Sequence, residues 1–417
     1  MLLARLARQV IREGRLTLID ARGHSHVIEG AREGPHAALR FHTAKAERRV
    51  AFNPQLALGE CYMDGSVEPE GCDIIDVLRL LISNMKHLDG SVLHDLTNRW
   101  RFVTRRIAQH NPIGKARDNV AHHYDLSSEL YQRFLDRDRF YSCAYFPEGV
   151  DTLEEAQAAK ARHLAAKLRL EPNARILDIG CGWGSLAMHL VRLGAQRVDG
   201  VTLSQEQHAW ASEWARREKL DRQARFHLRD YRDVEEQYDR IVSVGMFEHV
   251  GVGHYEEYFA KVARLLREDG VAVIHSIGRS SPPGFTNPWL AKYIFPGGYV
   301  PALSEVLPVI EKAGLIVTDL EVLRVHYAET LRHWRERFLA HWDEVAELYD
   351  ERFCRMWNFY LAGSETSFRE GDMMVFQVQL AKTHAAVPLT RDYIHNFENA
   401  HPLDQTMSKA RVEQPAE

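Results

Sequence analysis

The chain has 417 residues, which is enough to bury one large hydrophobic core or two, so two domains are expected. Apolar residues make up 45% and charged residues 27% of the chain, as in an ordinary globular protein. The formal net charge of -5 argues against a dedicated nucleic-acid-binding protein, because such proteins usually carry a strongly basic surface. The five cysteines include no CxxC pair, which argues against a zinc ribbon or disulfide scaffold and fits a reducing compartment.

The N-terminal stretch MLLARLARQVIREGRLTLID contains no apolar run long enough for a secretory signal. It favours a short amphipathic helix whose polar side carries Arg5, Arg8, Arg12 and Arg15. No run of about 18 apolar residues occurs in the sequence, so no membrane-spanning helix is predicted. We therefore expect a soluble, cytoplasmic protein whose association with membranes is transient.

Composition divides the chain into an N-terminal domain (1–95), a basic linker (96–118), a catalytic domain (119–385) and a C-terminal tail (386–417). The N-terminal domain mixes a helix, strand-like runs at 16–20 and 38–42, and a helical stretch at 73–85. The linker carries Arg99, Arg101, Arg105, Arg106, Lys115 and Arg117. Such a basic run is most often a solvated face, but it would also suit anionic phospholipid headgroups. The tail is expected to be loosely held.

Within 119–385, apolar strand-like runs alternate with helical stretches, which predicts an α/β fold with a mostly parallel sheet. The predicted strands lie at 174–179, 197–203, 224–228, 238–245, 270–277, 315–323 and 374–382. The last of them is expected to be antiparallel in a seven-stranded sheet. Beyond Tyr327, apolar residues recur at three- and four-residue steps as far as residue 360, which predicts one long amphipathic helix or two end to end.

A glycine-rich turn, ILDIGCGWGSL, follows the first of these strands and opens a helix. Gly180, Gly182 and Gly184 allow a tight turn and the close approach of a ligand to the backbone. Their spacing differs from the G-x-G-x-x-G pattern of dinucleotide-binding proteins. With Asp178 just before it, the turn resembles the first motif of S-adenosylmethionine-dependent methyltransferases. The glycines would then make room for the methionine moiety.

Residues at the ends of the second and third strands fit a nucleoside pocket. Asp230 could accept the adenine amino group while Tyr231 covers the ring. Many methyltransferases hold the ribose with an acid at the end of the second strand, where this chain has Thr202 and Gln207 instead. Asp199 precedes the end of this strand, and its side chain is expected to be exposed. The predicted cofactor-binding set is completed by Tyr141, Ser142 and Leu203.

Several motifs together resemble the cyclopropane-fatty-acyl-phospholipid synthase family, which is related to the mycolic acid cyclopropane synthases. They are NVAHHYDLSSELYQRFLDRDRFYSCAYF, GMFEHVG, VIHSIG, YIFPGGYVP and HYAETL, and the resemblance extends over about residues 115–382. It implies a class I, Rossmann-like methyltransferase domain behind a smaller, mixed N-terminal domain that associates with lipid or membrane. It also implies a homodimer.

The same resemblance implies that a methylene from S-adenosylmethionine is added to the cis double bond of an unsaturated phospholipid acyl chain at the membrane surface. Methyl transfer would give a carbocation, which a bound bicarbonate would deprotonate before the ring closes. Bicarbonate would be held by backbone groups of Cys143 and Ile277 and by the side chains of Glu248, His275 and Tyr327. Glu248 would hold the protonated oxygen of bicarbonate or take its proton onward.

Other interpretations remain open. Relatives with the same fold methylate an alkene and give a methylene- or methyl-branched chain, or act on a hydroxymycolate carbon, a sphingoid base or a small amine. A non-catalytic lipid-binding protein of this fold is a further alternative. His249 is expected to pack in the structure, and His122 and His123 lack metal-ligand spacing, so no metal site is predicted.

Overall fold

The computed structural model describes residues 1–85 and 127–403, and these residues form two compact units. The first unit contains residues 1–85, 284–296 and 331–373, and the second contains 127–283, 297–330 and 374–403. The division therefore differs from the boundaries predicted from sequence, because two segments of the predicted catalytic region pack with N-terminal residues. The predicted basic linker (96–118), with His122 and His123 beyond it, lies outside the described residues.

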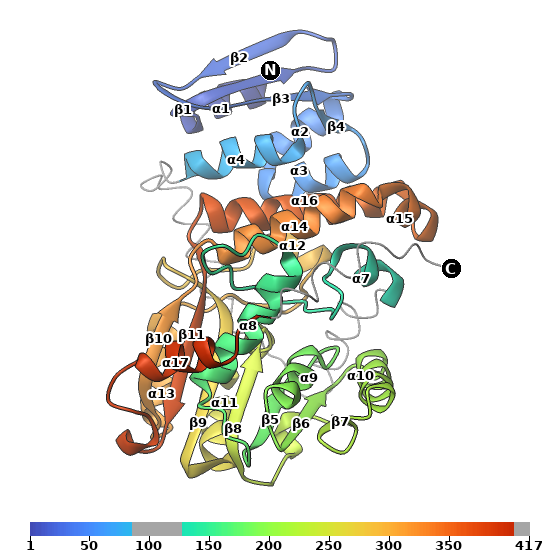
Figure 1. The fold of residues 1–417 in the computed structure, drawn as a ribbon. Helices are drawn as coiled ribbons and strands as arrows, with labels where there is room; N and C mark the ends of the chain where they lie inside the picture. Colours follow the sequence, from blue (N-terminus) through green and yellow to red (C-terminus); the bar gives the residue numbers. More distant parts are fainter. Residues whose placement is uncertain (86–126, 404–417) are drawn as a thin grey trace. The chain divides into compact units, whose positions relative to one another are not determined.

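The first unit is built on a four-stranded sheet with the strand order β2-β1-β3-β4 (Figure 1). β1 pairs antiparallel with β2 and parallel with β3, and β3 pairs antiparallel with β4. The strands are β1 (Glu13–Ile19), β2 (Ser25–Glu29), β3 (Arg32–Phe41) and β4 (Val67–Pro69). The helices are α1 (Leu2–Val10), α2 (Ala44–Phe52), α3 (Pro54–Met63), α4 (Ile74–Met85), α12 (Pro288–Tyr293), α14 (His326–Ala340), α15 (Trp342–Leu348) and α16 (Glu351–Arg369). Of α14, only the part that begins at Leu331 belongs to this unit.

One hydrophobic core stabilises this first unit. Leu16 and Leu18 of β1 are buried on alternate positions, while Ile74 and Val77 of α4 recur at helical spacing. α16 packs against both α3 and α4 and adds Ala362 to the same core. The residues that follow Tyr327 thus form three helices, α14, α15 and α16, where the sequence predicts one or two.

The predicted N-terminal helix is confirmed as α1, but it ends at Val10. Arg5 and Arg8 are exposed on it, whereas Arg12 precedes β1 and Arg15 lies within β1. The basic face of the helix is therefore shorter than the sequence predicts.

The second unit contains a seven-stranded sheet with the order β10-β11-β9-β8-β5-β6-β7. β7, β6, β5, β8 and β9 run parallel, and β11 pairs antiparallel with β10, so the predicted mostly parallel sheet and its final strand are confirmed. The strands are β5 (Arg175–Ile179), β6 (Arg197–Thr202), β7 (Ala224–Leu228), β8 (Tyr238–Val244), β9 (Leu266–Arg279), β10 (Ile316–Val322) and β11 (Met373–Ala381). The helices are α7 (Ser128–Phe134), α8 (Leu153–Lys167), α9 (Ser185–Arg192), α10 (Gln205–Arg217), α11 (Tyr255–Leu265), α13 (Leu303–Lys312) and α17 (Asp392–Ala400), with short 3-10 turns η1 (Tyr231–Asp233), η2 (Phe247–His249), η3 (Val252–His254) and η4 (His384–Ala386).

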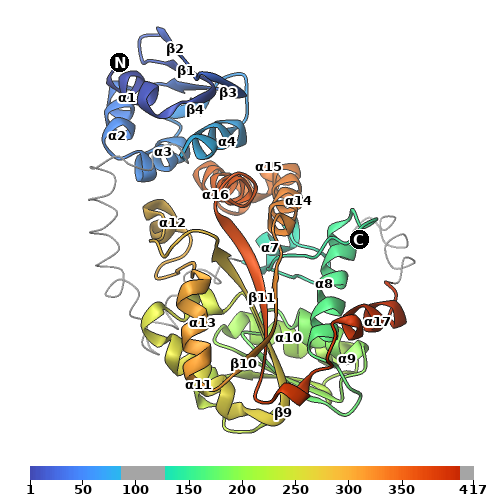
Figure 2. The ribbon, with the colours of Figure 1, turned by 90° about the vertical axis from the view of Figure 1, so that its left-hand side faces the viewer.

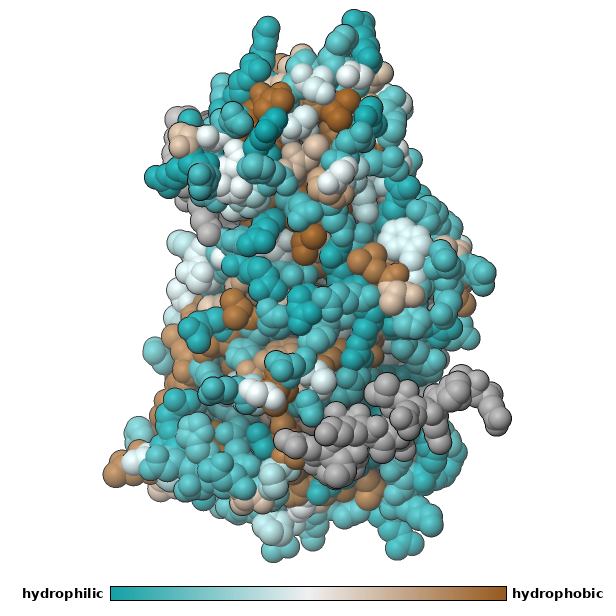
Figure 3. All heavy atoms as spheres, turned by 45° about the horizontal axis from the view of Figure 1, so that its top comes forward, coloured by the Kyte–Doolittle hydropathy of each residue, from teal (hydrophilic) through white to brown (hydrophobic). Residues whose placement is uncertain are grey.

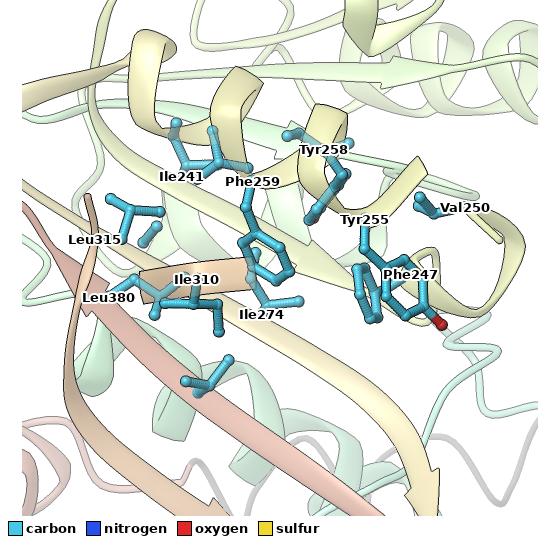
Figure 4. Close-up of a cluster of buried hydrophobic side chains, with 14 of the residues drawn as sticks. Ile241, Phe247, Val250, Tyr255, Tyr258, Phe259, Ile274, Ile310, Leu315 and Leu380 are labelled. Carbon is cyan, nitrogen blue, oxygen red and sulfur yellow. The ribbon is translucent and has the colours of Figure 1, made fainter. Parts of the chain in front are cut away.

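Helices cover both faces of this sheet (Figure 2). On one face, α11 and α13 pack on alternate residues of β8 and β9 such as Ile241 and Ile274 (Figure 4). On the other face, α8, α9 and α10 pack on the intervening residues, such as Val242 and Val273. Strands buried on both faces need continuous apolar runs, which is why their sequences lack a polar alternation.

The segment from residue 386 is not a loose tail throughout, because α17 packs against α8. The Arg162 guanidinium donates to the carbonyl oxygens of Glu398 and His401. The Glu398 carboxylate also accepts a 2.8 Å hydrogen bond from Nδ1 of the buried His163. The prediction of a loosely held tail is therefore wrong for residues 392–400.

No helix in the described parts of the chain is long and apolar enough to cross a membrane. Hydrophilic side chains dominate the face shown in Figure 3, and apolar side chains appear there as scattered patches. Exposed Leu2 and Leu6 of α1 are among the larger apolar residues at the surface.

Asn84 ties the end of α4 to the start of β1, and its loss should destabilise the first unit. Its Oδ1 accepts from the Arg12 and Glu13 amides at 2.6 and 3.0 Å, and its Nδ2 donates to the Glu13 carbonyl at 3.0 Å. Asn84→Ala leaves these backbone groups without partners, so we expect a loss of about 2–4 kcal/mol in unfolding free energy. Chemical denaturation of the full chain measures it.

The matched control is the neighbouring Ser83→Ala, which removes a single hydrogen bond to the Leu80 carbonyl. It should cost about 1 kcal/mol or less. Equal losses in the two variants would contradict the role given to Asn84.

Candidate active site

The glycine-rich turn leaves β5 with three glycines in the left-handed region, at φ +79° for Gly180, +54° for Gly182 and +85° for Gly184. A Cβ on Gly180 would come within 2.7 Å of the Met246 side chain, and one on Gly184 within 2.7 Å of the Phe226 ring. At Gly182, by contrast, no atom of the described residues lies within 4 Å of such a Cβ. The outer glycines are thus required by packing, and the middle one borders open space that a ligand can enter.

Asp178, near the end of β5, is 2% exposed, and its Oδ2 has no hydrogen-bond partner among the described residues. Burial raises the pKa of this carboxyl to about 7, although the Lys160 charge opposes the shift. An unpaired buried oxygen is costly, so this position suits a ligand that brings a donor or a positive charge. S-adenosylmethionine carries both.

At the end of β6, the structure brings the predicted residues Thr202 and Gln207 together. Ser204 caps α10 by accepting from the Gln207 amide at 3.3 Å, and Leu203 lies between the strand and this cap. The Thr202 hydroxyl then donates to Gln207 Oε1 at 3.0 Å. A hydroxyl and an amide are therefore the polar groups at the end of β6.

Asp199 is not exposed, contrary to the sequence-based expectation. It is 1% exposed and lies 2.8 Å from the Arg197 guanidinium in an ion pair. Parallel strands are covered on both faces here, so a polar residue within β6 is buried and needs a partner. Asp199 is therefore a paired structural residue rather than a ribose ligand.

At the end of β7, Asp230 is buried and its carboxylate is held by Arg232. Oδ1 accepts from the Arg232 amide and Nε, both at 2.9 Å, and Oδ2 accepts from Nη2 at 2.7 Å. An oxygen has two acceptor sites, so Oδ2 keeps one for another donor. Tyr231 follows directly and packs edge-on against Tyr258.

Glu248 lies in η2, just beyond β8, and its neighbour anchors it. Phe247 packs 4.4 Å from the Tyr255 ring inside the core of this unit (Figure 4). Glu248 Oε1 accepts from the Ile277 amide at 2.6 Å, while Oε2 is buried without a partner among the described residues. Burial raises the pKa of Glu248 to about 7, so its carboxyl can hold or release a proton near neutrality.

His275, on β9, faces the same edge of the sheet as a neutral imidazole. Burial lowers its pKa well below the usual value. The Gln377 Nε2 on β11 donates to His275 Nδ1 at 3.1 Å, so the ring proton is on Nε2. Nε2–H is a donor suited to an anion. The Ile277 amide donates to Glu248, and the Ile277 carbonyl accepts from the Ser276 hydroxyl at 2.9 Å, which leaves one acceptor position of that carbonyl for a ligand.

The segment that carries Cys143 is hydrogen-bonded to the start of α14, which carries Tyr327. The Ala144 amide donates to Thr330 Oγ1 and the Phe146 amide to His326 Nδ1, each at 3.0 Å. Tyr327, which follows His326, is 8% exposed. Burial raises the pKa of the Cys143 thiol far above its normal value, so a backbone role suits Cys143 better than a nucleophilic one.

Tyr141 and Ser142 precede Cys143 in the same segment. Tyr141 packs edge-on against Tyr131, and the Ser142 hydroxyl accepts from Lys160 Nζ at 2.8 Å. His249, predicted to be structural, is half-buried, and desolvation by its surroundings lowers its pKa to about 4.

Sequence reasoning missed Lys160, Gln157 and Gln377, which support the predicted residues. Their signal in the sequence is weak: Gln157 and Lys160 lie among the alanines of α8, and Gln377 lies in the largely apolar β11. A buried polar residue in such a stretch needs a partner, which only the fold identifies.

The fold and the turn after β5 define a class I methyltransferase. The chain matches a structure of the cyclopropane synthase CmaA1 complexed with SAH and CTAB, with a TM-score of 0.60 and 35% identity over 63% of this chain and 97% of that one. It belongs to the mycolic acid cyclopropane synthetase family, whose model matches residues 113–378.

Two curated relatives cover most of the chain. The Escherichia coli (strain K12) cyclopropane-fatty-acyl-phospholipid synthase is 40% identical over 335 residues, 80% of this chain and 85% of that protein. The tuberculostearic acid methyltransferase UfaA1 of Mycobacterium tuberculosis is 36% identical over 370 residues, 85% of each chain. Both pairings extend well beyond the glycine-rich turn.

Open space at Gly182 predicts a selective effect on cofactor binding. Gly182→Ala places a methyl group where the cofactor would approach, so we expect S-adenosylhomocysteine to bind at least tenfold more weakly, measured by calorimetry. Gly314→Ala is the control, because Gly314 also has a positive φ (+72°) and open space around it. Both changes introduce a similar backbone strain of about 1 kcal/mol. Equal affinities in the two variants would contradict a cofactor site at this turn.

Proposed function

We propose that this protein is an S-adenosylmethionine-dependent cyclopropane-fatty-acyl-phospholipid synthase. The enzyme adds a methylene carbon to the cis double bond of an unsaturated phospholipid acyl chain. The observation that carries this proposal is the buried Glu248 at the carboxyl edge of the sheet: its Oε1 accepts from the Ile277 amide, two residues along β9 from the neutral His275, and its Oε2 has no partner among the described residues. This is the edge at which open α/β sheets bind their ligands.

S-adenosylmethionine supplies the methyl group. The alkene attacks this methyl group, the sulfur–carbon bond breaks and S-adenosylhomocysteine leaves, so that one alkene carbon carries the methyl and the other becomes cationic. Loss of a proton from the new methyl then allows a carbon–carbon bond to close the ring. An alkene is a weak nucleophile, so the protein must hold the partners close together and exclude water. The buried Asp178, Glu248 and His275 have the dry surroundings that this reaction needs.

We propose that bicarbonate accepts the proton, held by the Cys143 amide, the Ile277 carbonyl, the His275 Nε2–H, the Glu248 carboxyl and the Tyr327 hydroxyl. Two features support this fit. The orphaned Glu248 Oε2 can accept from the protonated oxygen of the anion, and His275 and Tyr327 can donate to its other oxygens. An amine substrate would not need this set, which favours an alkene.

The cofactor is proposed to lie along the ends of β5, β6 and β7. Gly180, Gly182 and Gly184 border the methionine part, with Asp178 beside it. Thr202, Leu203 and Gln207 face the ribose, and Asp230 with Tyr231 faces the adenine. Tyr141 and Ser142 complete the pocket. Transient docking on phospholipid membranes and assembly into a homodimer are also proposed.

The product distinguishes this function from a branched-chain methyltransferase. Purified protein is incubated with vesicles of a cis-unsaturated phosphatidylethanolamine and S-adenosylmethionine labelled in its methyl carbon, followed by mass spectrometry and NMR of the acyl chain. We expect a labelled cyclopropane carbon. A methylene or methyl branch would support the alternative activity, and unchanged lipid together with no cofactor binding would support a non-catalytic lipid-binding protein.

Glu248→Gln is the variant for the same assay. Removing the ionisable group should leave S-adenosylhomocysteine binding intact but slow turnover about tenfold or more, the range expected for lost acid–base or electrostatic help. Full activity in this variant would contradict the role proposed for Glu248.

A further inference from the structure

Lys160 is a buried ammonium group that the proposed reaction does not yet use. It lies on α8 with 0% of its surface exposed, and it has no ion-pair partner among the described residues. Its Nζ donates to Ser142 Oγ at 2.8 Å and lies 3.7 Å from the centre of the Phe140 ring. An unpaired buried cation is costly, so its position calls for a functional reason.

The charge of Lys160 reaches both parts of the candidate site. Its charge opposes the rise that burial causes in the pKa of Asp178 and of Cys143, and adds to the lowering that burial causes in the pKa of His275. Burial lowers the pKa of Lys160 itself to about 7, so an anion bound nearby would favour its charged form. Among the charges that act on Lys160, that of the buried Asp136 contributes most. A positive charge in dry surroundings acts over several ångströms with little screening.

The same face of α8 also fixes the segment that carries Cys143. Gln157, one turn before Lys160, donates to the Ser142 carbonyl at 3.0 Å, and the Ala156 carbonyl accepts from the Tyr145 amide at 3.1 Å. With the Ala144 amide already bound to Thr330, the backbone on both sides of Cys143 is held in place.

The Cys143 amide itself is left available. Within the described parts of the chain, it donates to no other group. A single free amide between fixed neighbours is a preorganised donor, which is the kind of group that stabilises an anion at no further cost in ordering.

We propose that Lys160 is a positioning residue for the methyl-transfer reaction: it holds Ser142 so that the Cys143 amide stays free, and its charge favours a small oxyanion at that amide. This inference rests on the proposed function. It also adds a positive charge to a site whose buried carboxyls, Glu248 and Asp178, contribute none.

Lys160→Met tests the inference, because it keeps the length of the side chain and removes its charge and donor. We expect S-adenosylhomocysteine affinity to stay within about threefold and kcat to fall about tenfold or more, the size typical of a lost electrostatic contribution. Lys167→Met is the matched control. This second buried lysine of α8 also acts on His275, but Glu321 and Asp319 balance its charge and it does not bond to Ser142, so its loss should lower stability but leave kcat within about twofold.

A second readout does not depend on turnover. Hydrogen–deuterium exchange of the peptide containing Tyr141–Phe146 is measured with S-adenosylhomocysteine, with and without sodium bicarbonate. Bicarbonate should slow exchange of this peptide in the wild type and in Lys167→Met, and should have no effect in Lys160→Met. If Lys160→Met does not fold, Lys160→Gln, which keeps a hydrogen-bond donor, takes its place with the same expectations.

The outcomes separate this inference from the proposed function. A wild-type protein that leaves unsaturated lipid unchanged contradicts the function itself. A wild-type protein that makes the cyclopropane, together with a Lys160 variant of unchanged kcat or equal bicarbonate protection, contradicts only the role of Lys160.

Discussion

Burial of ionisable groups at the carboxyl ends of β5, β8 and β9 is the constraint on which the site depends. Removing a carboxyl from water favours its neutral form, and this raises the pKa of both Asp178 and Glu248 to about 7. The same effect keeps His275 neutral. The site therefore offers polar groups with little net charge of their own, surrounded by protein rather than water. Such surroundings suit a carbocation that must lose a proton without meeting a water molecule.

The sheet fixes the positions of these groups relative to one another. Val244 and His275 are register partners across β8 and β9, and the Gly245 amide donates to the His275 carbonyl at 2.9 Å. Phe247 then enters the hydrophobic core and turns the chain, so that Glu248 reaches the Ile277 amide. Apolar packing on both faces thus fixes the polar groups at the edge. The positions of Glu248 and His275 therefore depend on the packing of the core.

Much of this arrangement could be predicted from sequence, because its signals are local. Buried parallel strands appear as short apolar runs, and the glycines of the turn follow one of them. Residues whose role depends on distant partners could not be predicted: Lys160 finds Ser142, and Gln377 finds His275, only in the folded chain. The predicted exposure of Asp199 was wrong for the same reason, because its ion pair with Arg197 is seen only in the folded chain. The packing of residues 331–373 with the N-terminal segment likewise depends on tertiary contacts, which no local sequence pattern predicts.

The pH dependence of stability, compared between wild type and Glu248→Gln, tests the desolvation of Glu248 most directly. Below pH 4.5, the pKa of this carboxyl in the unfolded chain, Glu248 is protonated in both states and costs no stability. As pH rises from there towards about 7, the carboxyl ionises in the unfolded state but not in the folded one, so the folded state loses stability. Glutamine does not titrate, so the stability advantage of the variant should grow by about 3 kcal/mol across this range and then level off. A difference that stays constant between these pH values would show that Glu248 ionises normally, and would contradict a dry, unpaired carboxyl at the centre of the site.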